Sequence, residues 1–259
     1  MANPIFNIVN IPRNSDSGRE HVEATTFGGV ETMTVNGAIQ TTLFLGLILL
    51  AAATFNWSRF SMGYTDMGAM LTVAGAILSF ILAIIILLSR LSISFQYIKY
   101  LVPFYAACEG LFLGGISAIF EASYPGIVST AVAGTFAALF TMLILYRLRI
   151  INCTQTFRSV ILISTLSVCV VYLVDMVGHL FGHSVPVVSS ATPMGILFSI
   201  VVVIIAAFNL IVDFDFIEQA ALRSFPKEFE WYCSFGLMVT IVWMYVEILR
   251  LLAKLQRRQ

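Results

Sequence analysis

The sequence predicts an all-α polytopic membrane protein, a bundle of seven transmembrane helices. Three observations lead to this fold class: 59% of the 259 residues are hydrophobic and only 11% are charged, the mean hydropathy is +0.94, and long apolar segments follow one another along the chain. A soluble domain carries about a quarter charged residues, so the charged side chains of this chain could not cover a water-facing surface. The formal net charge is zero, which argues against a nucleic-acid partner because such a partner requires a basic patch.

A bilayer core of about 30 Å needs ~20 mostly apolar helical residues. Seven segments between polar or Gly/Pro-rich breaks meet this requirement: 39–56, 68–89, 101–120, 127–146, 159–181, 194–217 and 231–253. Residues 1–38 are rich in Asn, Ser, Thr and Gly and contain no apolar run long enough for a cleaved signal peptide. The sequence therefore predicts a flexible cytoplasmic tail over 1–38, a transmembrane domain over 39–253 and a short basic tail over 254–259.

The basic residues of the loops predict the orientation, since cytoplasmic loops carry an excess of Lys and Arg. With the N-terminus inside, seven basic residues lie in the inner loops and Arg59 alone in the outer loops; the seven are Arg90, Lys99, Arg147, Arg149, Arg158, Arg223 and Lys227. An odd number of spans then places Lys254, Arg257 and Arg258 outside, against the rule. Either the earlier helices overrule these C-terminal charges, or the last segment does not fully cross and both termini are cytoplasmic.

The chain lacks the motifs of membrane enzymes and of resident cofactors. The four cysteines form no CxxC pair, so we expect packing residues rather than disulfides or metal ligands. Gly-x-Gly-Asp, expected of a membrane aspartyl protease, and Gly-x-Ser-x-Gly, expected of a membrane serine protease, do not occur. A retinal protein needs a buried lysine for its Schiff base, but the only lysine near the last helix, Lys254, lies past its apolar part. We expect no enzymatic activity and no permanently bound cofactor.

The ionisable residues inside the predicted spans are all acidic: Glu109, Asp175, Asp213, Asp215 and Glu247. An ionisable group within a membrane indicates a functional site. No Lys or Arg lies near the middle of a span, so these carboxyls must be protonated, share protons or be neutralised by a bound cation. This pattern indicates a pathway for cations or protons rather than for anions.

Asp213 and Glu247 form the most specific pair. The midpoint between them is residue 230, inside the polar stretch 226–230 that must form a turn. If the hairpin turns there, both acids lie at similar depth on neighbouring antiparallel helices, share one proton and titrate near physiological pH. Two alternatives remain open: Asp213 lies in the headgroup zone, and Glu247 pairs locally with Arg250 at i+3.

Two polar neighbours accompany Asp213 on the sixth span. Asp215 lies about 200° around the helix from Asp213, so we assign Asp215 to the cytoplasmic vestibule or the solvated helix end. Asn209 is expected on the inward face with Asp213 and Ile217.

Glu109 lies beside a stripe of small residues in the third span, Ala106, Gly110, Gly114 and Ala118, which recur every four residues. Such a stripe allows the backbone of another helix to approach closely. We interpret it as helix packing, with Glu109 at its edge, where the carboxyl could line a pathway.

Asp175, His179 and His183 repeat at i, i+4 and i+8 at the end of the fifth span. This is metal-ligand spacing if the helix continues that far, and Gly178 and Gly182 weaken that condition. The alternative is a pair of histidines at the outer membrane interface.

Several stretches carry a resemblance to a known family: 33–37 (MTVNG), 109–117 (EGLFLGGIS), 124–127 (YPGI), 209–218 (NLIVDFDFIE), 230–232 (EWY) and 243–249 (WMYVEIL). With these motifs the chain resembles the Bax inhibitor/YccA-like family, also called TMBIM, in its bacterial branch. The resemblance implies a seven-helix bundle with the last helix central, a bacterial cytoplasmic membrane location, and links to a pH-sensitive calcium leak and to suppression of cell death or membrane stress.

The resemblance also implies roles for particular residues. Asp213, followed by Ile217, matches an acid of the family's sixth helix, and Glu247, after Tyr245, matches an acid of its last helix. In relatives the two acids share a proton and close the pore on the cytoplasmic side, and Arg90 is the nearest match to a basic residue that engages them.

The leading hypothesis is therefore a pH-sensitive leak channel for Ca²⁺, in contact with the lipid bilayer and with protons. One alternative is a regulatory protein that acts by binding another membrane protein, such as a membrane protease, or within a stress or cell-death pathway. The other is a proton-coupled transporter, for which the sequence shows no internal repeat.

Overall fold

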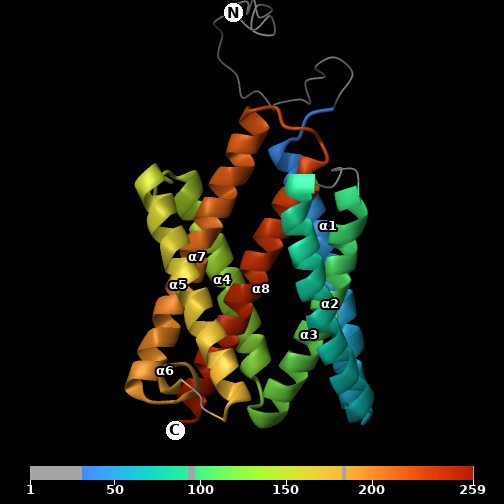
Figure 1. The fold of residues 1–259 in the computed structure, drawn as a ribbon, viewed down its shortest axis with the longest axis vertical. Coiled ribbons are helices and arrows are strands. Elements are labelled where there is room, and N and C mark those ends of the chain that lie inside the picture. Colours follow the sequence, from blue (N-terminus) through green and yellow to red (C-terminus); the bar gives the residue numbers. More distant parts are fainter. Residues whose placement is uncertain (1–30, 93–96, 183–184, 259) are drawn as a thin grey trace, which may run out of the picture.

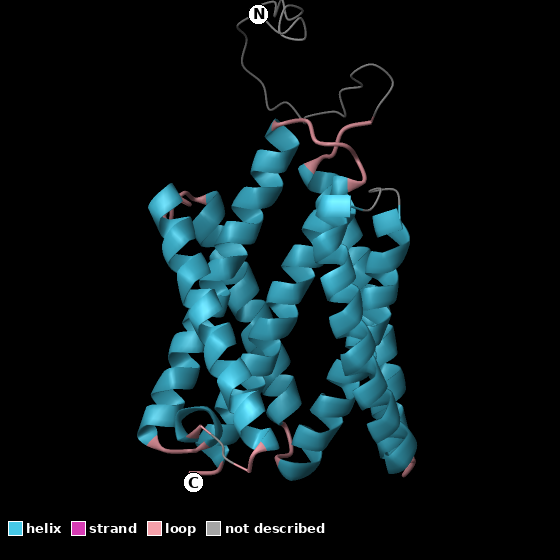
Figure 2. Ribbon diagram, in the orientation of Figure 1, coloured by secondary structure: helices cyan, strands magenta, loops and turns pink. Residues whose placement is uncertain are grey.

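The computed structural model describes residues 31–92, 97–182 and 185–258. Within these ranges the chain forms eight helices and no named strand (Figure 2). The helices are α1 (Val35–Ser61), α2 (Thr65–Ser92), α3 (Ile98–Ser123), α4 (Ile127–Arg147), α5 (Gln155–Leu180), α6 (Pro186–Ser189), α7 (Pro193–Leu222) and α8 (Phe229–Gln256). All but the four-residue α6 are long and apolar enough to cross a membrane. The all-α class and the seven predicted spans are confirmed.

Helices α1, α5 and α7 begin before the predicted apolar segments, each at a turn that a threonine caps. The Thr34 hydroxyl accepts a hydrogen bond from the Gly37 amide at 2.9 Å, and Thr154 and Thr192 cap α5 and α7 in the same way. As a result α1 begins at Val35, inside the region predicted as a tail. Hydropathy alone does not find such capping turns, because their side chains are polar.

Helix α8 lies between two groups of helices (Figure 1). Helices α1, α2 and α3 pack together, α4 and α5 each pack on α7, and α8 contacts α1, α3, α4 and α7. Half of the most apolar stretch of α8 is buried, against 11% for α5 at the edge of the bundle. The last helix is therefore central, as the family resemblance implied.

The small-residue stripe of α3 is a packing surface for α1. A side chain added at Gly110 would meet the Leu49 carbonyl, and one added at Gly114 would meet the Ala53 carbonyl. Nearby, the fully buried Asn56 donates to the Leu111 carbonyl at 2.7 Å and to the Thr72 hydroxyl at 3.0 Å. The stripe and this amide hold α1, α2 and α3 together.

The segment that precedes α1 is bound to the turn between α7 and α8. Its contacts are backbone hydrogen bonds from Met33 to Phe225 and from Lys227 to Glu31, a β-bridge between Thr32 and Pro226, an ion pair between Lys227 and Glu31, and a bond from the Thr34 amide to Glu230. Residues 31–34 are thus part of the folded domain. Residues 1–30 of the predicted tail lie outside the described residues.

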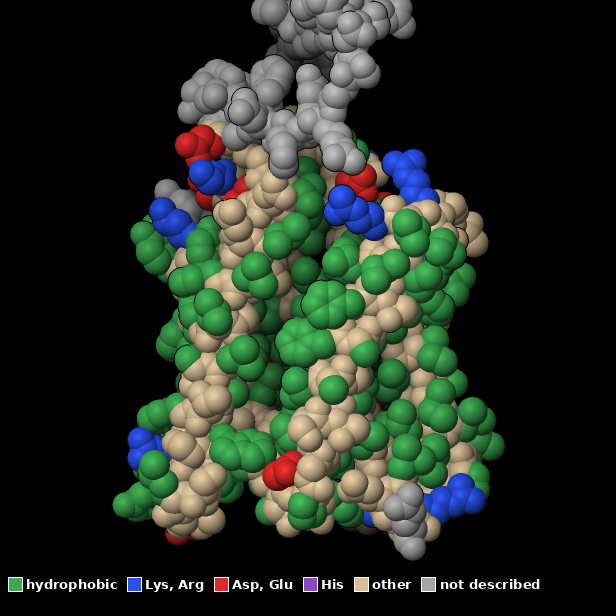
Figure 3. Space-filling model, turned by 180° about the vertical axis from the view of Figure 1, so that it is seen from behind, with side chains coloured by type: hydrophobic (Ala, Val, Ile, Leu, Met, Phe, Trp, Pro, Cys, Tyr) green, Lys and Arg blue, Asp and Glu red, His purple; other side chains and the backbone are tan. Residues whose placement is uncertain are grey.

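The described chain begins and ends at opposite ends of the bundle (Figure 1). The 28 residues of α8 span about 42 Å, more than the ~30 Å of a bilayer core, so the last helix is long enough to cross fully. Charged side chains gather at the two ends, and the surface between them is mostly hydrophobic (Figure 3). Side chains such as Leu47, Met70 and Phe80, each more than 60% exposed, form this surface, which fits contact with lipid.

Candidate functional site

The carboxyl of Asp213 lies in the contact between α7 and α8. Its Oδ2 atom is buried and has no hydrogen-bond partner in the described part of the chain, and the side chain is within hydrogen-bonding reach of the Thr240 hydroxyl on α8. Thr240 precedes Glu247 by seven residues, about 10 Å along a helix. The structure therefore does not bring Asp213 and Glu247 together at one depth.

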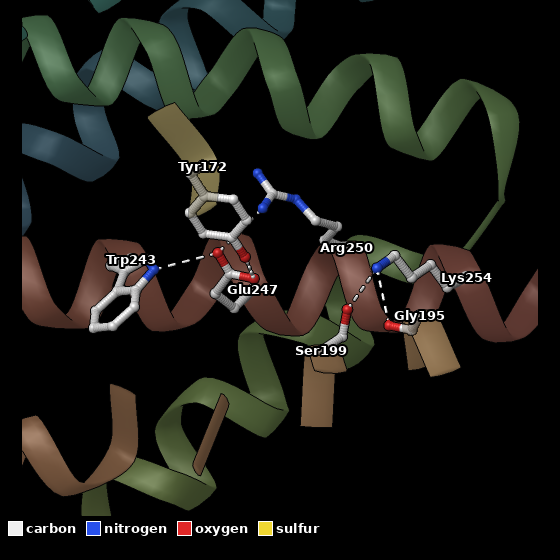
Figure 4. A network of polar contacts seen from close by, with 7 residues as sticks. All are labelled: Tyr172, Gly195, Ser199, Trp243, Glu247, Arg250 and Lys254. Atoms are coloured by element: carbon white, nitrogen blue, oxygen red, sulfur yellow. Dashed lines mark hydrogen bonds and ion pairs between the residues drawn. The ribbon is translucent and has the colours of Figure 1, made fainter. Parts of the chain in front are cut away.

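Glu247 has its own network of partners, shown in Figure 4. The residue is 1% exposed, and its carboxylate accepts hydrogen bonds from the Tyr172 hydroxyl at 2.8 Å, from Trp243 Nε1 at 3.2 Å and from Arg250 Nη1 at 3.2 Å. The Arg250 guanidinium also lies 4.9 Å from the centre of the Tyr172 ring. Local pairing of Glu247 with Arg250, one of the alternatives that the sequence left open, is the arrangement in this structure.

Lys254 is the residue that sequence reasoning missed. It was assigned to the basic tail, but it lies in α8 and is only 4% exposed. Its ammonium donates to the Gly195 carbonyl at 3.1 Å and to the Ser199 hydroxyl at 2.8 Å, both on α7. The available signal was the spacing i, i+3 and i+7 from Glu247 through Arg250 to Lys254, which places all three on one helix face.

The polar neighbours of Asp213 on α7 face other helices. Asp215 forms an ion pair with Arg158 in the first turns of α5. Asn209 donates to the Thr165 hydroxyl of α5 at 2.8 Å. Asn209 therefore bonds to α5 while Asp213 lies against α8; that the two residues share the inward face of α7 stays a prediction.

The comparison with known families gives one match. The family described as Bax inhibitor 1 like matches residues 3–257, nearly the whole chain. The chain belongs to the Bax inhibitor 1-like family. No curated protein and no solved structure matches it.

In this Bax inhibitor 1-like chain, Glu109 lies away from the contact between α7 and α8. The residue is 9% exposed, and its carboxyl is within hydrogen-bonding reach of the Ser79 hydroxyl on α2. A lining role for Glu109 would therefore concern the α2–α3 contact. Arg90 belongs to α2, and its side chain lies outside the described residues.

The proposed metal ligands at the end of α5 do not form a cluster in the described part of this family member. Helix α5 ends at Leu180, three positions before His183, so the helical spacing does not reach that residue, which lies outside the described residues. The Asp175 carboxylate accepts the Val185 amide at 2.8 Å and lies 3.7 Å from His179 Nδ1. No group of three potential metal ligands occurs among the described residues.

Proposed function

We propose that this protein is a pH-sensitive cation leak channel, with Ca²⁺ as the permeant ion, and that protonation of Asp213 controls it. The observation that carries the proposal is the buried Asp213 oxygen without a hydrogen-bond partner in the described chain. An ionised carboxylate is very costly in such a place unless a partner neutralises it. Asp213 is therefore protonated while α7 and α8 are closed around it.

Ionisation of Asp213 provides the opening step. When the pH on the side of the α7–α8 turn rises, the Asp213 carboxyl loses its proton. The resulting carboxylate is stable only with a cation or water beside it, and either must enter between the two helices. Carboxylate oxygens are ligands that Ca²⁺ prefers. A neutral closed state and a cation-binding ionised state together give a leak that increases with pH.

Glu247 serves as a second control point in this proposal. It follows Thr240, the α8 neighbour of Asp213, by about two helical turns, and its carboxylate is occupied by Arg250 and Tyr172. The two acids thus act in series along α8 rather than as one proton-sharing pair. A cation that has passed Asp213 meets Glu247 once the contact with Arg250 opens.

The test is calcium flux into liposomes that contain the purified protein and a calcium-sensitive dye. Native protein should show a leak that grows with pH, and Asp213→Asn should show a low leak at every pH because the amide cannot ionise. Glu247→Gln should change the size of the leak but keep its pH response. Asp66→Asn is the matched control, since Asp66 is an exposed acid in the first turn of α2. A pH response of Asp213→Asn equal to that of native protein would exclude the mechanism.

A regulatory binding protein remains the second candidate function, and one observation favours it. Residues 31–34 are bonded to the α7–α8 turn, so the chain that precedes them starts from the end of the bundle where that turn lies. A partner such as a membrane protease or a stress-pathway protein could bind there. Deletion of residues 1–30 should abolish such docking and leave a leak intact; a proton-coupled transporter would instead show saturable uptake of an organic substrate.

We also propose a bacterial cytoplasmic membrane location with the N-terminus in the cytoplasm. The support is the excess of basic residues in the loops that share an end with the N-terminal segment. A reporter domain that is active only outside the cytoplasm, fused after Gln259, tests the orientation. The proposed orientation predicts that this reporter is active. The proposed activity requires neither enzymatic chemistry nor a resident cofactor.

A further inference from the structure

A cavity of about 420 Å³ lies beside the C-terminal part of α8, and residues of α3, α5 and α6 complete its lining. Three basic residues of α8 line it, Arg250, Lys254 and Arg257, together with one acid, Asp175. Figure 4 shows Arg250 and Lys254 extending from the same stretch of α8. The lining is therefore rich in hydrogen-bond donors that carry positive charge.

Of the three basic residues that line this cavity, only Arg250 forms an ion pair with an acid among the described residues. Glu247 compensates Arg250, and Asp175 is engaged by the Val185 amide and lies near His179. Lys254 has only neutral acceptors among the described residues, the Gly195 carbonyl and the Ser199 hydroxyl. Since an ammonium has three donors, one N–H group of this buried residue is left for a ligand.

Arg257 is the second basic residue of the cavity lining that forms no ion pair among the described residues. Its Nε donates to the Tyr124 hydroxyl at 3.0 Å, a neutral partner. A guanidinium carries five N–H donors in a planar fork that fits phosphate oxygens. Lys254 and Arg257 lie one turn apart on α8, and neither forms an ion pair within the part of the chain that the structure describes. This ammonium and guanidinium thus point to an anion with several oxygens.

The position and the apolar part of the lining indicate where that anion comes from. Phe120, Met176 and Val188 line the cavity beside the basic residues. Arg257 is the C-cap of α8, so the basic side chains lie near the membrane surface, where headgroups are found. Basic pockets between transmembrane helices on the cytoplasmic or matrix side bind anionic lipid headgroups, and the same attraction between basic side chains and a phosphate applies at this end of the bundle.

We propose that this cavity binds the phosphate group of an anionic phospholipid through Arg250, Lys254 and Arg257. The apolar side chains contact the glycerol and upper acyl chains of that lipid. This site is separate from Asp213, and the inference does not depend on the proposed leak activity.

The test uses full-length protein in a neutral detergent, titrated with phosphatidylglycerol, with retained lipid counted by native mass spectrometry. One phosphatidylglycerol per protein should be retained in preference to phosphatidylcholine. Arg257→Gln should weaken retention about tenfold to a hundredfold, as expected for loss of one hydrogen bond between charged groups, and Lys254→Met should weaken it at least as much. Arg258→Gln is the matched control, because Arg258 is also exposed but does not line the cavity.

Two results would overturn the proposal. The first is that native protein and Arg257→Gln each retain phosphatidylglycerol and phosphatidylcholine equally. Because Arg257 is exposed, Arg257→Gln keeps the fold, so this result can be obtained even if Lys254→Met does not fold. The second is binding of inorganic phosphate that depends on Lys254 and Arg257 while phosphatidylglycerol is not retained, which would assign the cavity to a soluble phosphate.

Discussion

The pairing of Glu247 with Arg250 can be measured by a double-mutant cycle. The single changes are Glu247→Gln, which keeps the size of the side chain, and Arg250→Met, which keeps an apolar stem over the Tyr172 ring. Glu247 is 1% exposed and the Arg250 side chain 36%. Breaking a fully buried pair costs about 3–5 kcal/mol, while an exposed pair contributes ~0–1 kcal/mol, so this half-exposed pair should show a coupling free energy of about 1–2 kcal/mol.

The same assay distinguishes this arrangement from a proton-sharing pair of acids. The free energy of unfolding is measured in mixed micelles of dodecyl maltoside and dodecyl sulfate by tryptophan fluorescence. Asp213→Asn and Glu247→Gln should be additive within about 0.5 kcal/mol, as for separated sites. A coupling below about 0.3 kcal/mol for Glu247 with Arg250, or a larger coupling for Glu247 with Asp213, would refute the assignment of partners.

Three further outcomes follow from other contacts. Gly110→Ala should destabilise the protein by about 1–3 kcal/mol, because the added methyl group meets the Leu49 carbonyl, while Gly46→Ala, with nothing within 4 Å, should not destabilise it in the same unfolding assay. Asn56→Ala should cost about 1–3 kcal/mol, since it removes buried hydrogen bonds to α2 and α3; an unchanged midpoint would show that these bonds are not formed. Burial, and secondly the nearby Asp215, raise the pKa of the Cys153 thiol, so less thiolate forms at a given pH. Maleimide should therefore modify Cys153 more slowly in the folded protein than in the unfolded chain at pH 8. Equal rates of modification in the two states would contradict the burial of this thiol.

The seven spans were predictable because their physical cause is a simple one. A helix in lipid must be apolar over ~20 residues, and this requirement is visible in the sequence without knowledge of the neighbours. The capping turns at Thr34, Thr154 and Thr192 were missed, because polar residues there satisfy free backbone amides. The stripe at Gly110 and Gly114 was found for the same reason as the spans: its period is a local property of one helix.

The partners of the acids were less predictable, since they depend on the relative positions of helices. The sequence midpoint placed the α7–α8 turn at residue 230, but α7 ends at Leu222 and α8 begins at Phe229. With the turn centred near residue 226, Asp213 lies opposite Thr240 rather than Glu247. A shift of a few residues in the turn is doubled in the pairing of antiparallel helices, which displaces the expected partner by two helical turns.

The basic residues of α8 show why a count of charges by position along a span is insufficient. Arg250 and Lys254 are near the helix end, where long basic side chains commonly extend toward the membrane surface. In this structure Lys254 is instead buried against Gly195 and Ser199 of α7. The charged groups next to α8 therefore differ along its length. The acid Asp213 of α7 lies against the middle of α8, and the basic residues Arg250, Lys254 and Arg257 lie near its C-terminus. A cation is attracted at the first place and repelled at the second. The leak proposal therefore requires that, once the contact between Glu247 and Arg250 has opened, Ca²⁺ leave by a path that Lys254 and Arg257 do not line. An anionic lipid bound to the basic residues would reduce the repulsion.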